Sequence, residues 1–296
     1  MAVHQSIIID GSNLAHRVYH ASKNIQGLHT ESLEGQDTTI AGRLLQSVGA
    51  LKRRFLHMSV CYVWGGSNQR RLKIDPEYKK GGSTLPDSVK EQVNLLRDLL
   101  PLLGVGQAEN PEEEGDDVVA SLNLKLGGYS IIVSNDMDFI QLVTRKTTLL
   151  KPKVGSGDEV AFDPDVVLNT YGFAPDGMRA WKSITGDSSD GISGVRGFKR
   201  ATAKEIASTA RSVEDILGTT AGSDKERAAL KLNESKLRVN WDLIGLHREL
   251  PYTLTEGAID LDLFESKGKL LGLPVEAILD PFKRAKQAGF LKVGGT

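Results

Sequence analysis

Acidic residues gather in four tight groups along the chain, and their positions suggest a common site. Each group follows an apolar run or stands at the start of a helical pattern. Taken singly, each has an ordinary structural explanation, because acids are favoured at helix N-termini and short Asp-containing segments often cap turns or helices. The groups are Asp10; Glu114, Asp116 and Asp117; Asp136 and Asp138; and Asp187 and Asp190.

The joint pattern of these acids indicates a metal centre. Asp10 and Asp136 follow apolar runs that we expect to be neighbouring parallel strands, so both end at one sheet edge. Carboxylates packed together there repel one another unless cations neutralise them. Oxygen ligands without a His/Cys set favour Mg²⁺ or Mn²⁺ over zinc. Two such ions roughly 4 Å apart stabilise the attacking and leaving oxygens of a phosphodiester displacement, which is nuclease chemistry.

Basic residues cluster beside the acids. Between Arg43 and Lys90 ten Lys/Arg face three acids, a local excess of +7, and between Arg179 and Arg211 the excess is +4. The segment 109–117 carries six acids and no base. A solvated face is the usual explanation for one charge run. Three runs of alternating sign beside the acid groups favour a polyanion held next to a metal centre.

The elements that position the acids alternate between strands and helices. Apolar runs predict buried strands at 6–10, 60–64, 129–133 and 147–151. Helical patterns occur at 12–22, 39–55, 87–103 and 116–126. This alternation predicts an α/β fold with a mostly parallel sheet and flanking helices.

The composition changes near residue 163, and we expect no strand after it. Short helices with Gly-rich joints are predicted at 164–172, 176–185, 201–209, 213–217, 224–238 and 275–287. We therefore predict a metal-dependent nuclease domain over 1–165 and an all-α domain over 166–296. Segment 218–296 is assigned to helical support of that second domain.

Length and composition bound the setting. The chain has 296 residues, of which 40% are hydrophobic and 25% charged, as in an ordinary globular protein. Its one cysteine, Cys61, excludes an intrachain disulfide and favours a reducing compartment. No apolar run is long enough to span a bilayer and the N-terminus lacks a signal-peptide layout, so we expect a cytoplasmic protein with no membrane partner. The net charge of −1 by itself argues against a nucleic-acid partner.

Five segments of the chain resemble the 5′ nuclease family of flap endonucleases and 5′–3′ exonucleases, most of all its bacteriophage type. They are 8–17 (IIDGSNLAHR), 70–71 with 76–79 (RR and PEYK), 114–117 (EGDD), 134–139 (SNDMDF) and 186–197 (GDSSDGISGVRG). Each motif alone is weak, but five in the family's order are specific. The resemblance implies a PIN-like core, a helical arch at about 66–100, and a C-terminal helix–three-turn–helix DNA-binding element at about 183–210.

The resemblance also implies roles for single residues. One metal ion would be held by Asp10, Glu114, Asp116 and Asp136, and a second would involve Asp138, Asp187 and Asp190; Asp117 is counted with these acids. From the arch, Lys79 with Arg70 or Arg71 would reach the scissile phosphate, and Tyr78 would stack on a base. Arg17 would contact the same strand. An exposed basic loop is the alternative for the three arch cations.

The helix–three-turn–helix element would hold the phosphates of duplex DNA, with a K⁺ ion. Its turn contains Gly191, Ser193, Gly194 and Gly197, followed by Lys199 and Arg200. Glycines allow positive φ and close backbone approach, which suits such a turn. A flexible loop is the alternative.

The chain departs from the family pattern in three places. Gly65 stands where an acid usually follows the second strand, and water or Asp75 would have to replace that acid. Gly81-Gly82 stands near the arch position where an Asn-Arg pair is usual, and Lys199 stands where another glycine is common.

We predict a monomeric, structure-specific 5′ nuclease that hydrolyses DNA at 5′ ends, flaps or junctions with two Mg²⁺ or Mn²⁺ ions. The family implies replication or repair in a bacterial or phage-infected cell. One alternative is a DNA-structure-binding protein whose nuclease activity is weakened by Gly65. Another is a small ribonuclease with the same carboxylates, against which the basic arch and the glycine-rich element argue. With eight acids assigned to metals, 30 acids face 37 bases, so the near-neutral net charge no longer excludes DNA.

Overall fold

The computed structural model describes residues 5–22, 29–80, 84–152 and 159–291. Its centre is a seven-stranded sheet in the order β6-β5-β4-β1-β2-β3-β9. The inner pairs are parallel, and the edge strands β6 and β9 run antiparallel to their neighbours. The predicted, mostly parallel α/β fold is therefore confirmed. The strands are β1 (Gln5–Asp10), β2 (Ser59–Trp64), β3 (Gly106–Glu109), β4 (Tyr129–Val133), β5 (Thr147–Lys151), β6 (Val160–Phe162) and β9 (Thr253–Thr255).

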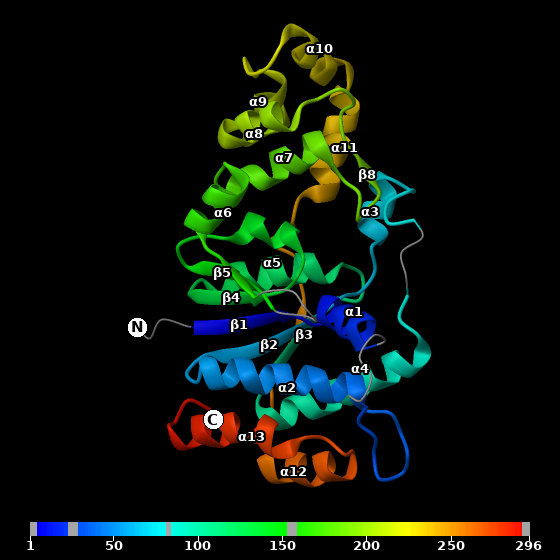
Figure 1. The fold of residues 1–296 in the computed structure, drawn as a ribbon, viewed down its shortest axis with the longest axis vertical. Helices are drawn as coiled ribbons and strands as arrows, with labels where there is room; N and C mark the ends of the chain where they lie inside the picture. Colours follow the sequence, from blue (N-terminus) through cyan, green and yellow to red (C-terminus); the bar gives the residue numbers. More distant parts are fainter. Residues whose placement is uncertain (1–4, 23–28, 81–83, 153–158, 292–296) are drawn as a thin grey trace.

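Helices cover both faces of this sheet (Figure 1). Side chains alternate along a strand, so in β1 Ile7 and Ile9 enter one core and Ile8 enters the other. The first core includes α1 (Gly11–Ser22), α2 (Thr39–Arg54), α4 (Asp87–Leu99) and the short η1 (Leu100–Leu103). The second includes α5 (Gly115–Leu126), η2 (Met137–Leu142), α6 (Pro164–Tyr171) and the helices that follow.

A helical region continues from the second face (Figure 1). It starts at α6, where Asp163 caps the helix by accepting hydrogen bonds from the backbone N–H groups of Asp165 and Val166. A two-stranded hairpin lies between α7 and α8, contrary to the expectation of no strand after 163. The elements are η3 (Pro175–Gly177), α7 (Met178–Thr185), β7 (Gly186–Asp187), β8 (Ile192–Ser193), α8 (Arg200–Thr209), α9 (Val213–Leu217), α10 (Asp224–Leu232) and α11 (Glu234–Ile244).

Residues 253–287 return to the sheet, which corrects the assignment of that part of 218–296 to support of the second domain, whereas α10 and α11 do pack with the second core. β9 extends the sheet beside β3, while α12 (Leu261–Leu270) and α13 (Val275–Gln287) join the first core. Gly49 of α2 permits a close crossing, since a Cβ there would lie 3.1 Å from the Ala277 carbonyl oxygen. Residues 253–287 therefore stabilise the first core and the sheet edge at β3. The boundary at 165 stays a prediction.

The segment expected to form an arch divides into two parts. α3 (Gln69–Ile74) and the turn after it contact the β7–β8 hairpin, where Lys79 N donates to Asp190 O at 3.1 Å. In contrast, α4 packs against α2 through core residues such as Leu96 and Leu99. Gly81-Gly82 lies outside the described residues. Within the described ranges, no helix has the length and apolar character needed to cross a membrane.

Lys52 of α2 is a buried cation whose cost to stability can be measured. Its side chain is 1% exposed, and Nζ donates to Met58 O at 2.7 Å. Burial lowers the Lys52 pKa from 10.5 to about 8. Between pH 8 and 10.5 the unfolded chain keeps this proton and the folded chain has lost it, so the Lys52 contribution to stability improves as pH rises.

We expect Lys52→Met to raise the free energy of unfolding at pH 7 by about 1–2 kcal/mol, after the loss of the Met58 hydrogen bond is subtracted. The gain should shrink at pH 9.5, where wild-type Lys52 is already neutral in the fold. Urea unfolding at both pH values measures this, with exposed Lys225→Met as a near-neutral control. A variant less stable than wild type at pH 7 would contradict the expectation.

Candidate functional site

The parallel strands bring the expected acids to one edge of the sheet. Asp10 is the last residue of β1, and Asp136 lies three residues beyond the end of β4, which pairs with β1 in parallel. Gly65 directly follows β2 on the other side of β1. The predicted juxtaposition of Asp10 and Asp136 is thus a consequence of sheet topology.

Asp10 is buried, with 3% of its surface exposed. Its Oδ1 accepts from the backbone N–H of Asn13 at 3.1 Å, and its Oδ2 accepts from the Ser134 hydroxyl at 2.8 Å. Burial raises the Asp10 pKa to about 6, and the negative charge of Asp136 adds to this rise. A nearby cation would stabilise the ionised form of a carboxylate held in this way.

Asp116 joins this group from the first turn of α5. Burial raises its pKa well above the usual range, and the charges of Asp136 and Asp10 raise it further. The first turn of α5 can approach β2 because both sides carry glycine: a Cβ on Gly115 would lie 3.2 Å from Gly65 Cα. Small residues at this crossing therefore help to place Asp116 beside Asp10.

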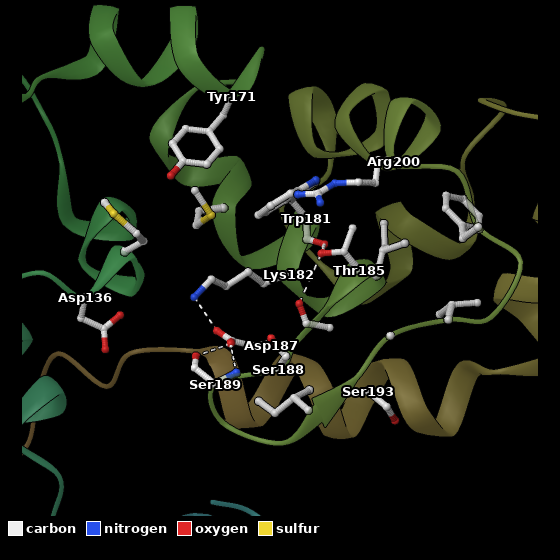
Figure 2. Close-up of a pocket in the computed structure, with 18 of the residues that line it drawn as sticks. Asp136, Tyr171, Trp181, Lys182, Thr185, Asp187, Ser188, Ser189, Ser193 and Arg200 are labelled. Carbon is white, nitrogen blue, oxygen red and sulfur yellow. Dashed lines mark hydrogen bonds and ion pairs between the residues drawn. The ribbon is translucent and has the colours of Figure 1, made fainter. Parts of the chain in front are cut away.

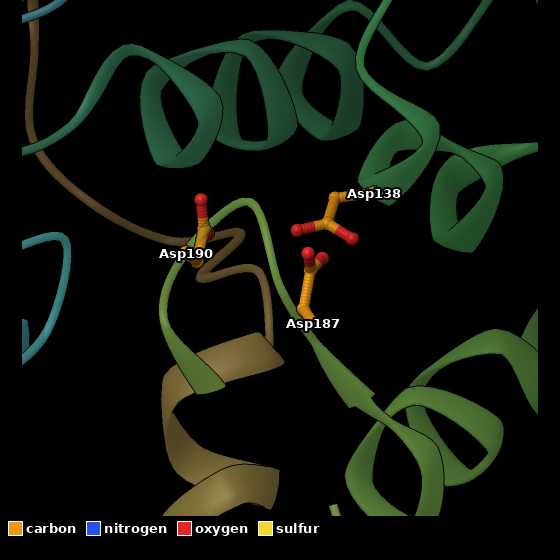
Figure 3. A group of neighbouring side chains, drawn as sticks. All are labelled: Asp138, Asp187 and Asp190. Carbon is orange, nitrogen blue, oxygen red and sulfur yellow. The ribbon is translucent and has the colours of Figure 1, made fainter. Parts of the chain in front are cut away.

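A second acidic group lies where η2 meets the β7–β8 hairpin (Figure 3). Asp138, Asp187 and Asp190 each offer a carboxylate oxygen, and these oxygens all lie within 4.8 Å of one another. Burial raises the Asp138 pKa to about 7, and the charge of Asp136 adds to it. Burial also raises the Asp190 pKa. This is the trio that the sequence predicts for a second metal ion.

Lys182 is a site residue that the sequence analysis did not identify. From α7 its ammonium contacts Asp138 and also donates to Asp187 Oδ2 at 2.6 Å. Burial of Asp187 is outweighed by hydrogen bonds from Lys182 and Ser189, so the Asp187 pKa is lowered. The sequence offers one signal: Lys182 stands among the apolar residues Met178, Ala180 and Ile184 on a short helix, and the structure buries all four.

Asp117 pairs with two arginines, and Arg71 NH1 joins its Oδ2 to Glu114 Oε2. It is fully buried, and Arg71 binds it at two points, NH1 to Oδ2 at 2.6 Å and NH2 to Oδ1 at 3.1 Å. Arg70 NH2 adds a 2.7 Å bond to Oδ2, and the His247 backbone N–H adds one to Oδ1. These bonds overcome burial and lower the Asp117 pKa. The structure therefore does not bring Asp117 to the metal centre.

Arg71 is engaged inside the protein and Arg70 is engaged with protein groups at its partly exposed edge, unlike the phosphate contacts expected for them. Arg71 is 3% exposed, and its Nε donates to Leu243 O at 2.8 Å. Arg70 also pairs with Glu113 and lies 2.8 Å from His247 Nε2 through NH1. With their N–H groups committed to these partners, the two arginines position the start of α5 against α3 and α11.

Lys79 lies between the two acidic groups. Its ammonium is 2.8 Å from Glu114 Oε1 and 3.7 Å from Asp190 Oδ2, and its side chain is 30% exposed. Among the described residues other than glycine, Lys79 alone has a positive φ, of 50°. Such strain often persists where function requires it. Arg71 also bonds Glu114, but of the three arch cations Lys79 is the one that reaches both acidic groups.

Tyr78 is buried, so its ring is not presented for stacking on a base. Its hydroxyl lies 3.2 Å from both Glu114 Oε2 and Asp190 Oδ2. The ring packs with Ile192, Leu243 and Ile244 in a small core. In this structure Tyr78 links the two acidic groups from the protein side.

The expected helix–three-turn–helix residues lie on the hairpin and loop between α7 and α8. Gly191 and Gly197 have φ values of 74° and 75°, which favour glycine. A Cβ on Gly194 would lie 2.4 Å from the Thr185 carbonyl, so only glycine fits there. Ser193, Lys199 and Arg200 are exposed, as is Arg17 on α1.

Asp75 does not replace the missing acid at Gly65 in this structure. Gly65 N donates to Ser12 Oγ at 2.9 Å, so it does lie at the site's edge. Asp75 instead accepts from the Glu77 backbone N–H in its own turn. A Cβ at Gly65 would lie 3.2 Å from Ser12 Oγ and 3.4 Å from Gly115 N, so a side chain fits after a small shift.

The second acidic group, Asp138, Asp187 and Asp190, fits a hard divalent cation. Its ligands are carboxylate oxygens, which Mg²⁺ and Mn²⁺ prefer, and no histidine or cysteine belongs to the trio of possible ligands found in the described chain. Raised pKa values at Asp10, Asp116, Asp138 and Asp190 show that burial together with like charge disfavours ionisation without a cation.

Comparison with known proteins agrees with this architecture. A T5 5′-exonuclease with bound divalent metal ions (zinc) superposes with a TM-score of 0.65 at 19% identity, covering 96% of this chain and 99% of that one. Flap endonuclease-1 from Methanococcus jannaschii gives 0.59 at 14% identity, covering 96% and 92%. At these identities the likeness establishes the fold.

Sequence relatives are more similar. A 5′-3′ exonuclease of Aquifex aeolicus is 28% identical over 290 residues, covering 95% of this chain and 97% of the relative. DNA polymerase I of Bacillus subtilis is 28% identical over 263 residues, and there the match covers 87% of this chain but only 28% of the polymerase. The family model described as 5′-3′ exonuclease, N-terminal resolvase-like domain matches residues 5–172. This chain belongs to the 5′-3′ exonuclease family.

Proposed function

We propose that this chain is a structure-specific 5′ nuclease that hydrolyses phosphodiester bonds of DNA at 5′ ends, flaps or junctions, using two Mg²⁺ or Mn²⁺ ions. One observation carries the proposal: separate segments converge so that two acidic groups, with Lys79 between them, share one edge of the sheet. Family membership supports the same activity.

The two acidic groups would divide the metal ions between them. Asp10, Glu114, Asp116 and Asp136 would hold one ion, and Asp138, Asp187 and Asp190 would hold the other. When bound, the ions would activate water and neutralise charge on the phosphate oxygens. Glu114 is fixed for this task by Arg71, Tyr78 and Lys79.

The chain's own cations would orient the substrate. Lys79 is positioned to donate to the scissile phosphate, because its 30% exposed ammonium lies between the acidic groups. Lys182 would neutralise Asp138 and Asp187 until an ion arrives. Arg17, outside both groups, would contact the same DNA strand.

Residues 186–200 would bind the duplex beside the site. The glycines at 191, 194 and 197 allow phosphate oxygens to approach the backbone closely, and a K⁺ ion would fit such a turn. Lys199 and Arg200 would supply charge at the start of α8. We expect the chain to act as a monomer.

The test is incubation of the purified protein with a 5′-flap DNA and Mg²⁺ or Mn²⁺, with and without chelator. We expect cleavage near the junction in either metal and none with chelator. Absence of cleavage in both metals would overturn the nuclease proposal. Tight, salt-dependent flap binding in that case would favour the alternative that Gly65 leaves a DNA-structure-binding protein.

Gly65→Asp tests that alternative directly. The Cβ distances leave room for the side chain at the site's edge, so we expect the new carboxylate to raise the cleavage rate at limiting Mg²⁺ by about 10-fold. Gly65→Asn is the matched control, with the same shape and no charge. If both variants cleave as wild type does, the absent acid does not limit the rate.

A further inference from the structure

The end of α11 and the residues that follow it, 240–248, contact the elements that carry both acidic groups. We call this stretch the support segment. Its Leu243 and Gly245 carbonyl oxygens accept hydrogen bonds from Arg71. Arg71 in turn binds Glu114 of the first acidic group. The second acidic group is reached from the same segment by other side chains, to which the proposed function gives no role.

Asn240 of the support segment holds the β7–β8 hairpin. Asn240 is buried, with 3% of its surface exposed, and its Nδ2 donates to Ser193 O of β8 at 3.0 Å and to Ser183 O of α7 at 2.9 Å. Figure 2 shows Ser193 next to the α11 helix, with Asp187 on the same hairpin. The hairpin that carries Asp187 and Asp190 is therefore fixed to α11.

Gln141 fixes η2 to the same segment. It is 9% exposed, and its side-chain Nε2 donates to Ile244 O at 3.1 Å. In the reverse direction, Arg248 NH2 donates to the backbone carbonyl oxygen of Gln141 at 2.7 Å. Ile244 lies about one helical turn after Asn240. η2 and the hairpin are thus held by neighbouring turns of one helix.

η2 needs support from outside because it is a long 3₁₀ helix. It runs for six residues, whereas 3₁₀ runs beyond three or four residues are uncommon because their hydrogen-bond geometry is poor. Asp136 caps its start, where the side-chain Oδ1 accepts from Asp138 N at 2.8 Å. At its other end the last carbonyl groups lack partners within the helix, and Arg248 supplies one for Gln141. Contacts that fix the end of η2 therefore also place Asp136 and Asp138 at its start.

We propose that Gln141 is a positioning residue for the second metal ion. By fixing η2 to the last turn of α11, it sets the place of Asp138 relative to Asp187 and Asp190 on the hairpin. The carboxylate oxygens of this trio all lie within 4.8 Å of one another, a spacing that depends on the two elements sharing one support. The inference rests on the proposed two-ion nuclease, and it adds a residue that itself contacts neither an ion nor the substrate.

Gln141→Leu tests the proposal, because it removes the amide and nearly keeps the size of the side chain. We expect calorimetric titration of the DNA-free variant to show Mn²⁺ binding about 10-fold weaker than in wild type, since supporting contacts of metal ligands typically matter at this level. In single-turnover cleavage of a 5′ flap, the Mg²⁺ concentration for half-maximal rate should rise by the same factor, and saturating Mg²⁺ should restore most of the rate. Wild-type Mn²⁺ affinity in this variant would overturn the proposal.

Gln92→Leu is the matched control, in which a buried amide is lost elsewhere. Gln92 of α4 is 2% exposed, and its Oε1 accepts from Ile40 N at 2.7 Å, at the start of α2. Urea unfolding should show lower stability for both variants, but only Gln141→Leu should lose Mn²⁺ affinity. An equal loss of affinity in the two variants would assign the effect to general destabilisation and would also overturn the proposal.

Arg248 provides a second route to the same measurement if Gln141→Leu does not fold. Arg248 is exposed, so Arg248→Met should fold while it loses the bond to η2. Its Mn²⁺ affinity should fall, whereas Arg248→Lys keeps a donor and should bind as wild type does. Wild-type affinity in Arg248→Met would then count against the proposal. If wild type binds Mn²⁺ but does not cleave the flap, the nuclease function is rejected, and the Mn²⁺ affinities still decide the role of Gln141.

Discussion

Replacing Asp136 with asparagine is expected to lower the rate of flap cleavage by about 10²- to 10³-fold. The same change should reduce the loss of folding stability that the metal-free protein shows as the pH rises to neutral. Asp136 is the acid common to both groups: its charge contributes to the raised pKa values of Asp10, Asp116, Asp138 and Asp190. Loss of its charge weakens both candidate ion sites and relieves repulsion when no ion is bound.

The sign of the pH effect follows from those pKa values. Asp10 and Asp138 titrate at about 6 and about 7 in the fold, against 3.8 for an ordinary aspartate. Between pH 4 and 7 these two carboxyls bind more protons in the folded chain than in the unfolded chain, so their contribution to metal-free stability falls as pH rises. Asp136→Asn lowers the folded pKa values and should flatten this fall.

Urea unfolding in chelator at pH 5 and pH 7.5 measures the stability effect, and single-turnover cleavage measures the rate. Mg²⁺ should stabilise wild type more than the variant, because only a bound ion shifts the folding equilibrium. Exposed Asp262→Asn on α12 is the matched control. A variant that cleaves at the wild-type rate, or whose stability depends on pH as that of wild type does, would contradict the central place given to Asp136.

The sequence predicts this centre well because sheet topology alone brings its parts together. Once 6–10 and 129–133 are assigned as parallel neighbours, Asp10 and Asp136 must share an edge. Asp138, Asp187 and Asp190 follow from the motif order and meet as expected. β3, β6 and β9 are too short for a run of apolar residues to identify them as strands, so the sequence does not predict them.

Charge counting by segment was less informative because it does not distinguish internal pairs from exposed cations. Three of the ten bases between 43 and 90 bind groups within the protein. Lys52 donates to a buried carbonyl oxygen, and Arg70 and Arg71 pair with acids of 113–117. Asp117 looks like Asp116 in sequence, yet one step along α5 turns it about 100° away, toward the arginines. Lys182 is counted in the run between Arg179 and Arg211, but the count does not show that it pairs with Asp138 and Asp187.

Arg71→Met is expected to destabilise the fold by about 3–5 kcal/mol, because it leaves the Asp117 carboxylate buried without its main partner. Arg71 also donates to the carbonyl oxygens of Leu243 and Gly245, so the same change releases the end of α11. The midpoint of urea unfolding measures the loss. Arg54→Met breaks a half-exposed pair with Glu159 and should cost at most about 1 kcal/mol.

A second substitution separates a structural arginine from a phosphate-binding one. If the cost arises from an unpaired buried carboxylate, adding Asp117→Asn to Arg71→Met should recover about 1–3 kcal/mol, although Asp117→Asn alone destabilises wild type. An arginine whose role is to hold the scissile phosphate would show no such coupling, and its loss would lower cleavage at unchanged stability. Glu114 adds a kinetic signature: Arg71 bonds its Oε2, so the folded single variant should also require more Mg²⁺ for half-maximal rate.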